Sequence, residues 1–254
     1  MADNREVRIK IRGLKKSFTD KKYNTLQVLD GLSLDVYKNE FLVILGPGQC
    51  GKTVLLNLIL GLDTPDEGTI EFSGGTPAKG EIGMVFQRYA LFPWKTVIQN
   101  VEACPKFHGV DKARRREEAQ ALIKLVGLAG FENAYPAALS GGMKQRVGIA
   151  RAYATNADIM LMDEPFGALD AQTRYQMQDE ILKIWQSKMT TVVFVTNNIE
   201  EAVTLGDRIV LLGNKPSVVV NEFVPHMERP RNNLSSEFLE FRNVIADKMD
   251  LALT

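Results

Sequence analysis

The sequence is poor in several features that would assign it to other classes of protein. It has two cysteines, Cys50 and Cys104, too few for a disulfide framework and without metal-ligand spacing, so a reducing compartment is expected. No apolar run approaches the roughly 18–20 residues that span a bilayer, and we expect another chain to cross any membrane that this protein serves. Lys and Arg number 31, as do Asp and Glu, which argues against a nucleic-acid partner held by bulk charge.

What is present is a regular alternation of strand and helix patterns. Strands are predicted at 7–11, 41–45, 68–72, 82–86, 159–162, 191–196 and 208–212. Helices are predicted at 52–60, 111–128 and 172–186, and from Ser235 onward. Alternating elements of this kind favour a mainly parallel sheet covered on both faces. The segment from about 88 to 157 is mostly helical in pattern, which indicates a subdomain inserted between core strands.

A phosphate-binding pattern, G-x-x-x-x-G-K-[ST], follows the apolar strand at 41–45. It consists of Gly46, Pro47, Gly48, Gln49, Cys50, Gly51, Lys52 and Thr53. Glycines allow a tight turn whose backbone N–H groups point at phosphate oxygens, and the following helix start adds partial positive charge. Lys52 is expected to reach the β- and γ-phosphates of ATP, and the Thr53 hydroxyl to ligate Mg²⁺.

Two acids end the apolar strand at 159–162. A carboxylate at the end of such a strand can hold Mg²⁺, the role expected for Asp163, and Glu164 is then placed to act as general base on the attacking water. A strand ending in Asp-Glu is common on its own as an acidic surface turn. Its position downstream of a phosphate-binding loop favours the functional interpretation.

These motifs and one further sequence resemble the ABC ATPase family. The run Leu139-Ser140-Gly141-Gly142-Met143-Lys144-Gln145-Arg146 is similar to the ABC signature sequence, which is far more specific than the phosphate loop. Gln87 resembles the glutamine of the family's Q-loop, and residues 167–170 resemble its D-loop. Phe18 stands where the family places an aromatic that stacks on adenine. The resemblance covers about residues 7 to 245.

The resemblance implies a fold and a domain plan. The fold class is α/β: a P-loop NTPase core with a mainly parallel sheet, an N-terminal antiparallel β-subdomain and an inserted helical subdomain. The ABC ATPase domain is expected at 1–225, with the helical subdomain at about 88–157, and a C-terminal helical tail at 226–254. Nucleotide contacts extend to Val54, and Gln87 joins Thr53 and Asp163 as a metal ligand.

The resemblance also implies partners. Two ATPase subunits share two ATP sites, and Ser140, Gly141 and Gly142 bind the nucleotide held by the other subunit, of the same or a different chain. ATP closes the dimer, and hydrolysis lets it open and drives transmembrane permease subunits. The aromatic stretch 88–94 then receives a short permease helix, although a subdomain core is the alternative. The protein is expected at the cytoplasmic face of the membrane, with no nucleic-acid partner.

The sequence departs from the family at the switch histidine. Asn197 occupies that position and Asn198 follows it, and neither histidine of the chain, His108 or His226, lies there. Asparagine forms hydrogen bonds but cannot carry a proton at neutral pH. We therefore predict a site that binds ATP and hydrolyses it slowly, with Asn197 in the catalytic set. A heterodimer with a complete second subunit, or a homodimer in which Asn197 suffices, both remain open.

The tail indicates the transporter type. Residues 227–231 and 235–242 resemble the ends of nitrate, sulfonate and taurine importer ATPases, which work with a solute-binding protein and two membrane subunits. Two other functions remain open. One is a largely non-hydrolytic regulatory ATP-binding subunit, which Asn197 favours and Glu164 opposes. The other is a soluble ABC ATPase outside transport, whose usual fused cassettes and basic linkers are not evident in this sequence.

Overall fold

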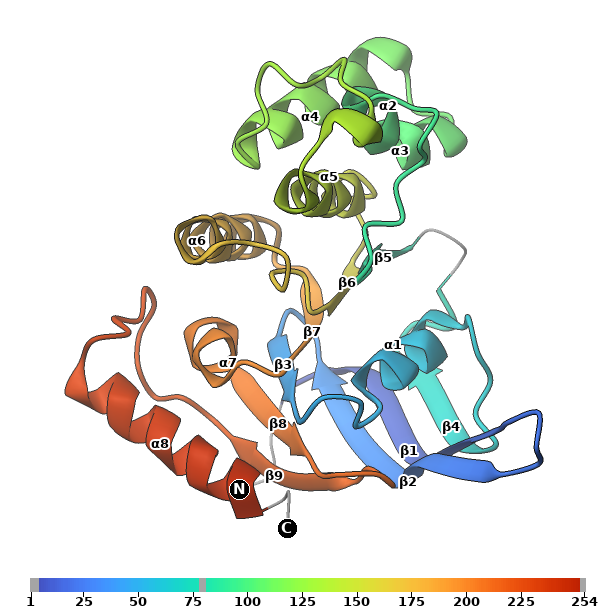
Figure 1. The fold of residues 1–254 in the computed structure, drawn as a ribbon, viewed down its shortest axis with the longest axis vertical. Coiled ribbons are helices and arrows are strands. Elements are labelled where there is room, and N and C mark those ends of the chain that lie inside the picture. Colours follow the sequence, from blue (N-terminus) through green and yellow to red (C-terminus); the bar gives the residue numbers. More distant parts are fainter. Residues whose placement is uncertain (1–4, 78–80, 252–254) are drawn as a thin grey trace. The chain divides into compact units, whose positions relative to one another are not determined.

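The computed structural model describes residues 5–77 and 81–251 (Figure 1). These residues form two compact units. The first unit combines the chain up to residue 76 with the chain from residue 189 onward, and the second comprises residues 77–188. The predicted boundary of the helical subdomain, 88–157, lies inside the second unit and stays a prediction. The outermost positions of the predicted domain and tail, 1–4 and 252–254, lie outside the described residues.

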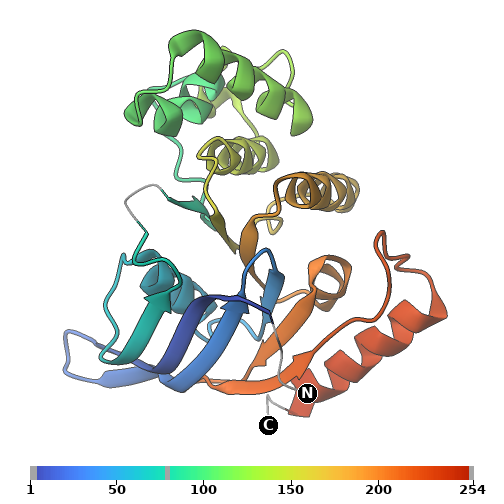
Figure 2. The ribbon, with the colours of Figure 1, turned by 180° about the vertical axis from the view of Figure 1, so that it is seen from behind.

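An antiparallel sheet begins the first unit, and Figure 2 shows it in front. Its strands are β1 (Val7–Thr19), β2 (Thr25–Tyr37) and β4 (Glu67–Phe72), in the order β2-β1-β4. Apolar side chains of β1 such as Ile9 and Ile11 are fully buried, whereas Lys10 between them is exposed. This period of two is the pattern of a sheet with one face on the core.

The parallel strands of the first unit are apolar throughout. They are β3 (Phe41–Leu45), β7 (Thr191–Thr196) and β8 (Arg208–Leu212), with β3 between the other two. Strand β9 (Val219–Phe223) adds to β8 in the antiparallel sense. Every residue of β3, β7 and β8 is buried, as expected for strands covered on both faces. Because β3 and β7 run in the same direction, their carboxyl ends lie at one edge.

Helices α1 (Lys52–Leu60), α7 (Ile199–Leu205) and α8 (Ser236–Leu251) accompany these strands. Helices α1 and α7 pack against the parallel strands, and α8 packs against α7 (Figure 1). Phe238 of α8 is buried, and the Ser235 hydroxyl accepts a hydrogen bond from its backbone N–H. This confirms the predicted start of the C-terminal helix.

The chain between β9 and α8 holds the C-terminal end of α7. The Arg231 guanidinium donates to the carbonyls of Val203 and Gly206, at 2.6 and 2.7 Å. Arg229 donates to Asp207 at 2.5 Å and to the carbonyl of Leu205. A helix leaves its last carbonyls without partners inside the helix, and here two arginines bind them.

The described part of the second unit contains the parallel strands β5 (Ile82–Val85) and β6 (Ile159–Asp163) and is otherwise mostly helical. Its helices are α2 (Val97–Val101), α3 (Ala103–Phe107), α4 (Lys112–Leu125), α5 (Gly141–Tyr153) and α6 (Ala171–Lys188), with a 3₁₀ turn at Pro136–Ala138. The parallel strands, the antiparallel β-subdomain and the helical segment that the sequence predicts are all present. Among the described residues, no helix is both long and apolar enough to cross a bilayer.

Candidate nucleotide-binding site

The phosphate loop connects β3 to α1 by a turn that excludes side chains at two glycines. Gly51 has a φ of 107° and, on top of that, a Cβ there would lie 2.8 Å from Cγ1 of Val28. A Cβ at Gly46 would lie 2.8 Å from the Cys50 sulfur. Gln49 also adopts a left-handed conformation, with a φ of 64°. The loop therefore follows a narrow path that glycine permits, the kind of turn whose backbone N–H groups can surround a phosphate.

Lys52 lies within this turn and is only 4% exposed. Its Nζ donates to the carbonyls of Gly46, at 2.9 Å, and Pro47, at 2.8 Å. The ammonium group is thereby held over the loop at the first residue of α1. Thr53 next to it is exposed, so its hydroxyl is available to a ligand.

Charge at the loop favours an anion. The first turn of α1 contains no acidic residue, so the partial positive charge of the helix start and the Lys52 ammonium act together. Cys50 does not contribute a thiolate, because it is 1% exposed and burial raises the pKa of its thiol. The glycine-lined turn and the positive charge of Lys52 fit the phosphates of ATP.

Asn197 follows β7 at the same sheet edge. Leu45 and Thr196 are register partners in β3 and β7, so the phosphate loop and Asn197 leave the sheet side by side. The Asn197 side chain is exposed. Its neighbours are fixed: the Thr196 hydroxyl donates to Glu201 at 2.6 Å, and Asn198 caps α7 by accepting from the backbone N–H groups of residues 200 and 201. The Asn197 side chain thus extends from a backbone whose neighbouring residues, Thr196 and Asn198, are both held by hydrogen bonds.

Phe18, the predicted adenine-stacking residue, lies on β1 in the same unit. Its side chain is 42% exposed, and the Lys16 ammonium lies 5.2 Å from the centroid of its ring. An exposed ring face of this kind is able to stack on a planar base.

The second unit contains the acidic part of the predicted site. Asp163 ends β6 and is 3% exposed, and Glu164 follows with a φ of 42°. Nε2 of Gln87 donates to Oε2 of Glu164 at 3.3 Å. The structure therefore brings together the two predicted catalytic residues of this unit. The left-handed backbone at Glu164 is uncommon for a residue other than glycine, and strain of this kind clusters at functional sites.

The signature sequence forms the start of α5. Ser140 is the N-cap, and its hydroxyl accepts from the backbone N–H of Met143 at 3.2 Å. A Cβ at Gly141 would lie 2.8 Å from the Tyr89 hydroxyl, and one at Gly142 would lie 3.3 Å from Cδ2 of Leu169. Because glycine has no side chain, Tyr89 and Leu169 can lie close to the backbone of the signature. Tyr89, which the sequence places only in the aromatic stretch 88–94, therefore lies against the signature, a contact that the motifs did not predict.

The aromatic stretch 88–94 is partly exposed. Trp94 is 69% exposed and Phe92 37%, with their ring centroids 5.7 Å apart. Arg151 donates to the carbonyl of Ala90 at 2.7 Å, which fixes the backbone of the stretch onto α5. The exposure of both rings fits the docking interpretation of this stretch better than the core alternative.

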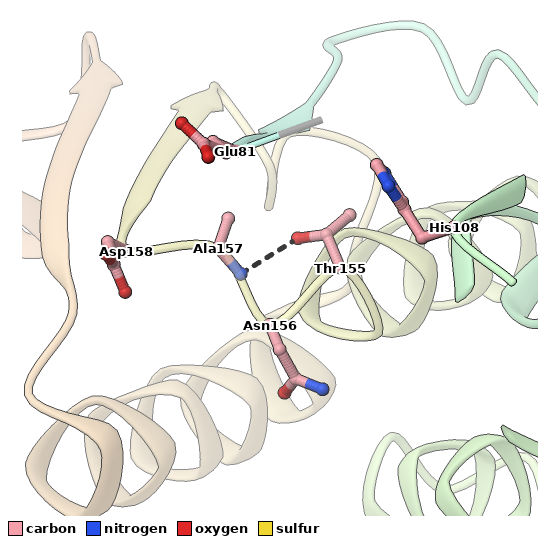
Figure 3. Close-up of a pocket in the computed structure, with 6 residues that line it drawn as sticks. All are labelled: Glu81, His108, Thr155, Asn156, Ala157 and Asp158. Atoms are coloured by element: carbon pink, nitrogen blue, oxygen red, sulfur yellow. Dashed lines mark hydrogen bonds between the residues drawn. The ribbon is translucent and has the colours of Figure 1, made fainter. Parts of the chain in front are cut away.

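A separate hollow lies at the other end of β6 from Asp163 (Figure 3). Its volume is about 220 Å³, and it is lined by Glu81, His108, Thr155, Asn156, Ala157 and Asp158. The Thr155 hydroxyl accepts from the backbone N–H of Ala157 at 3.3 Å. None of the predicted site residues lines this hollow.

Comparisons with known proteins agree with these motifs. The family described as "ABC transporter" matches residues 29–167. An uncharacterized ABC transporter ATP-binding protein of Methanocaldococcus jannaschii is 48% identical over 254 residues, which cover 97% of this chain and 94% of the relative. The aliphatic sulfonates import ATP-binding protein SsuB of Bacillus cereus is 39% identical, covering 95% and 96%. The taurine import ATP-binding protein TauB of Rhizobium johnstonii is 47% identical, covering 78% and 77%.

Solved structures extend the similarity to the fold. A dimeric ATP-binding cassette in a post-hydrolysis state, bound to ADP and Pi, superposes with a TM-score of 0.76 at 32% identity, covering 88% of this chain and 99% of that one. A dimeric bacterial ABC transporter cassette gives the same TM-score at 33% identity and the same coverage. The predicted fold class is confirmed by these neighbours. The chain belongs to the ABC transporter family, as an ATP-binding and ATP-hydrolysing subunit.

Proposed function

We propose that this chain powers the import of a small solute through an ABC transporter at the cytoplasmic face of the membrane. The observation that carries the proposal is the phosphate loop, in which Lys52 is held by two loop carbonyls at the start of α1. The importer assignment is supported by relatives that are named as sulfonate and taurine import proteins. The partners are two permease subunits, a second ABC ATPase subunit and an extracytoplasmic solute-binding protein.

ATP binding is the task of the first unit. The backbone of residues 46–51 receives the phosphates, Lys52 neutralises the β- and γ-phosphates, and Thr53 and Val54 complete the contact at the start of α1. Phe18 stacks on the adenine. The exposure of the Phe18 ring supports its stacking on adenine. The absence of acidic residues from the first turn of α1 supports phosphate binding there.

Hydrolysis is assigned to the residues that the motifs identify. Thr53, Gln87 and Asp163 would hold Mg²⁺, which would neutralise charge on the phosphates. Glu164 accepts a proton from the attacking water as general base, and Gln87 holds that carboxylate through its hydrogen bond. The conformation of Glu164 supports this role, because its side chain is directed by an unusual backbone at the end of β6.

Ser140, Gly141 and Gly142 serve the nucleotide of the second ATPase subunit. The backbone at a helix start and the small side chains suit a phosphate group, and α5 begins at Gly141 with Ser140 as its cap. The dimer is supported by two solved relatives that are described as dimeric.

The site hydrolyses ATP slowly because Asn197 replaces an ionisable side chain. A second candidate function follows from the same observation: a regulatory subunit that binds ATP and leaves most hydrolysis to a different partner. Asn197 favours it, and the intact Glu164 favours the hydrolytic role. Turnover of the purified chain, alone and with its permease, separates the two.

Replacement of Lys52 tests the proposal directly. Lys52→Ala is expected to weaken Mg·ATP binding at least about a hundredfold, since it removes a charged partner of the phosphates. Lys38→Ala is the matched control, because Lys38 lies before β3 and pairs with Glu6 at 2.9 Å. Binding is measured by titration with a fluorescent ATP analogue, and complex assembly by copurification with the permease. Unchanged affinity and assembly in Lys52→Ala would overturn the proposal.

A further inference from the structure

Ser217 is a fully buried polar residue between β8 and β9, with 0% exposure. Its backbone is fixed on β2. The Ser217 N–H donates to the carbonyl of Val28 at 2.8 Å, and its carbonyl accepts from the N–H of Asp30 at 3.3 Å. Two backbone hydrogen bonds therefore set the position of this side chain.

The Ser217 hydroxyl connects this position to the phosphate loop. Its Oγ donates to the carbonyl of Cys50 in the loop, and lies 3.1 Å from the carbonyl of Gly213 at the end of β8. The phosphate loop, β2 and the chain after β8 thus meet at Ser217, the loop through its side chain and β2 through its backbone. The loop, β2 and the chain after β8 all belong to the first unit.

The bond to Cys50 also determines which way the next N–H points. In a planar trans peptide, the C=O of one residue and the N–H of the following residue point in opposite directions. When the Cys50 carbonyl is turned toward Ser217, the Gly51 N–H is turned away from it. A hydroxyl on one side of the loop therefore orients a donor on the other side.

Apolar packing from the same strand supports the loop around this bond. A Cβ at Gly51 would lie 2.8 Å from Cγ1 of Val28 and 3.1 Å from Cδ2 of Leu29. The loop thus rests on β2 without a gap, and the Ser217 hydroxyl supplies the polar contact of this support.

We infer that Ser217 is a positioning residue that keeps the phosphate loop in its nucleotide-binding shape before ATP arrives. The inference rests on the proposed ATP-binding function of the loop. A loop that is already ordered loses less conformational freedom on binding, so affinity rises without a new contact to the ligand. Ser217 itself does not touch the nucleotide.

The test compares Ser217→Ala with Thr191→Val in the full chain. Thr191 is a matched control: it is 2% exposed, and its hydroxyl accepts from the N–H of Asn39 at 3.0 Å near the start of β3, at the other end of that strand from the loop. Loss of the Ser217 hydroxyl is expected to raise the dissociation constant of Mg·ATP about fivefold, which corresponds to the net free energy of one typical hydrogen bond. The control is expected to leave it within about twofold of the parent protein while losing comparable thermal stability.

A second measurement is hydrogen exchange of residues 47–53 in nucleotide-free protein. Exchange there is expected to be faster in Ser217→Ala and unchanged in Thr191→Val, and Ser217→Thr, which keeps a hydroxyl, should restore affinity. Equal affinity and equal loop exchange in Ser217→Ala and the control would overturn the inference. Lys52→Ala distinguishes failure of the positioning role from failure of the proposed ATP-binding function. If Lys52→Ala abolishes binding while Ser217→Ala has no effect, only the positioning role of Ser217 fails.

Discussion

Gln87 and Glu164 are joined side chain to side chain, with Nε2 of the glutamine 3.3 Å from Oε2 of the glutamate. The contact follows from strand register. Val85 and Met162 are partners in the parallel pair of β5 and β6, and each of the two polar residues lies two positions beyond its strand partner. The amide thus holds the carboxylate that we propose as general base, in a segment whose backbone conformation at position 164 is itself uncommon.

Replacement of Glu164 by Gln should separate ATP binding from hydrolysis. The amide keeps the size of the side chain and cannot accept a proton from water, so turnover is expected to fall by about 10²–10⁴-fold. Affinity for Mg·ATP should stay within a few-fold of the parent. Glu180→Gln on α6 is the control, because Glu180 pairs with Lys183 at 2.8 Å. Steady-state phosphate release and nucleotide titration measure both quantities, and unchanged turnover would exclude Glu164 as the base.

Introduction of histidine at position 197 should accelerate hydrolysis. The side chain lies exposed at the end of β7, where an imidazole can carry charge that asparagine cannot. We expect Asn197→His to raise turnover about tenfold, equivalent to about 1.4 kcal/mol of transition-state stabilisation. Asn243→His, at an exposed position of α8, should have no effect. Fast turnover of the unaltered protein that does not respond to Asn197→His would remove the idea of a slow site.

A buried ion pair should make a measurable contribution to the stability of the first unit. Nε of Arg208 lies 2.7 Å from Oε1 of Glu40, with the two side chains 6% and 2% exposed. Removal of one partner leaves a buried charge, so Arg208→Met is expected to lower the free energy of unfolding by about 3–5 kcal/mol. Glu40→Leu combined with Arg208→Met should cost less than the two single changes added together. Urea unfolding measures all three variants, and strict additivity would contradict a direct coupling.

Stability at α4 should depend on pH through its N-cap. The Asp111 carboxylate accepts from the backbone N–H groups of Arg114 and Ala113, which holds the pKa of this carboxyl below its usual value. Because the folded-state pKa is lower than the unfolded one, the stabilisation is present above the unfolded pKa and is lost as pH falls through the folded pKa. Asp111→Ala should therefore unfold more easily than the parent at pH 7, and the difference should shrink in acid.

The matched variant for this prediction is Asp111→Asn. Its side-chain oxygen still caps the helix, so we expect stability at pH 7 close to the parent, without the loss in acid. Thermal midpoints recorded from pH 7 down to about pH 2, where aspartate is protonated, provide the comparison. An acid dependence that is the same in Asp111→Asn and the parent would assign it to other carboxyl groups.

Elements with strong local patterns could be predicted from the sequence with their bounds. Strands β3, β7 and β8 and helix α1 occupy the predicted residues, because short apolar runs bounded by polar or glycine residues define them. Strands β2 and β9 were not predicted. Both pair with an antiparallel partner, β1 and β8 respectively. In β2, Leu32, Leu34 and Val36 are buried and alternate with Ser33 and Asp35, a signal that could have identified this strand. Helix α7 was also not predicted, because its 7 residues are too few to show a repeating helical pattern.

The residues of the candidate site could likewise be predicted only in part. Lys52, Asp163, Glu164 and Ser140 could be named from motifs, because each motif is local in sequence. Contacts between distant segments could not be predicted. The hydroxyl of Tyr89 lies against Gly141, and that of Ser217 binds the carbonyl of Cys50, 167 positions away. Such contacts depend on strand order and register, which the residue pattern of one segment does not specify.

Helix α7 depends on donors that come later in the chain. Arg231 binds the carbonyl of Gly206 across 25 positions, and Arg229 binds that of Leu205 across 24. The helix is therefore complete only when the chain around residues 229–231 has folded back onto it. A chain that ends before residue 229 would leave the carbonyls of Leu205 and Gly206 to water.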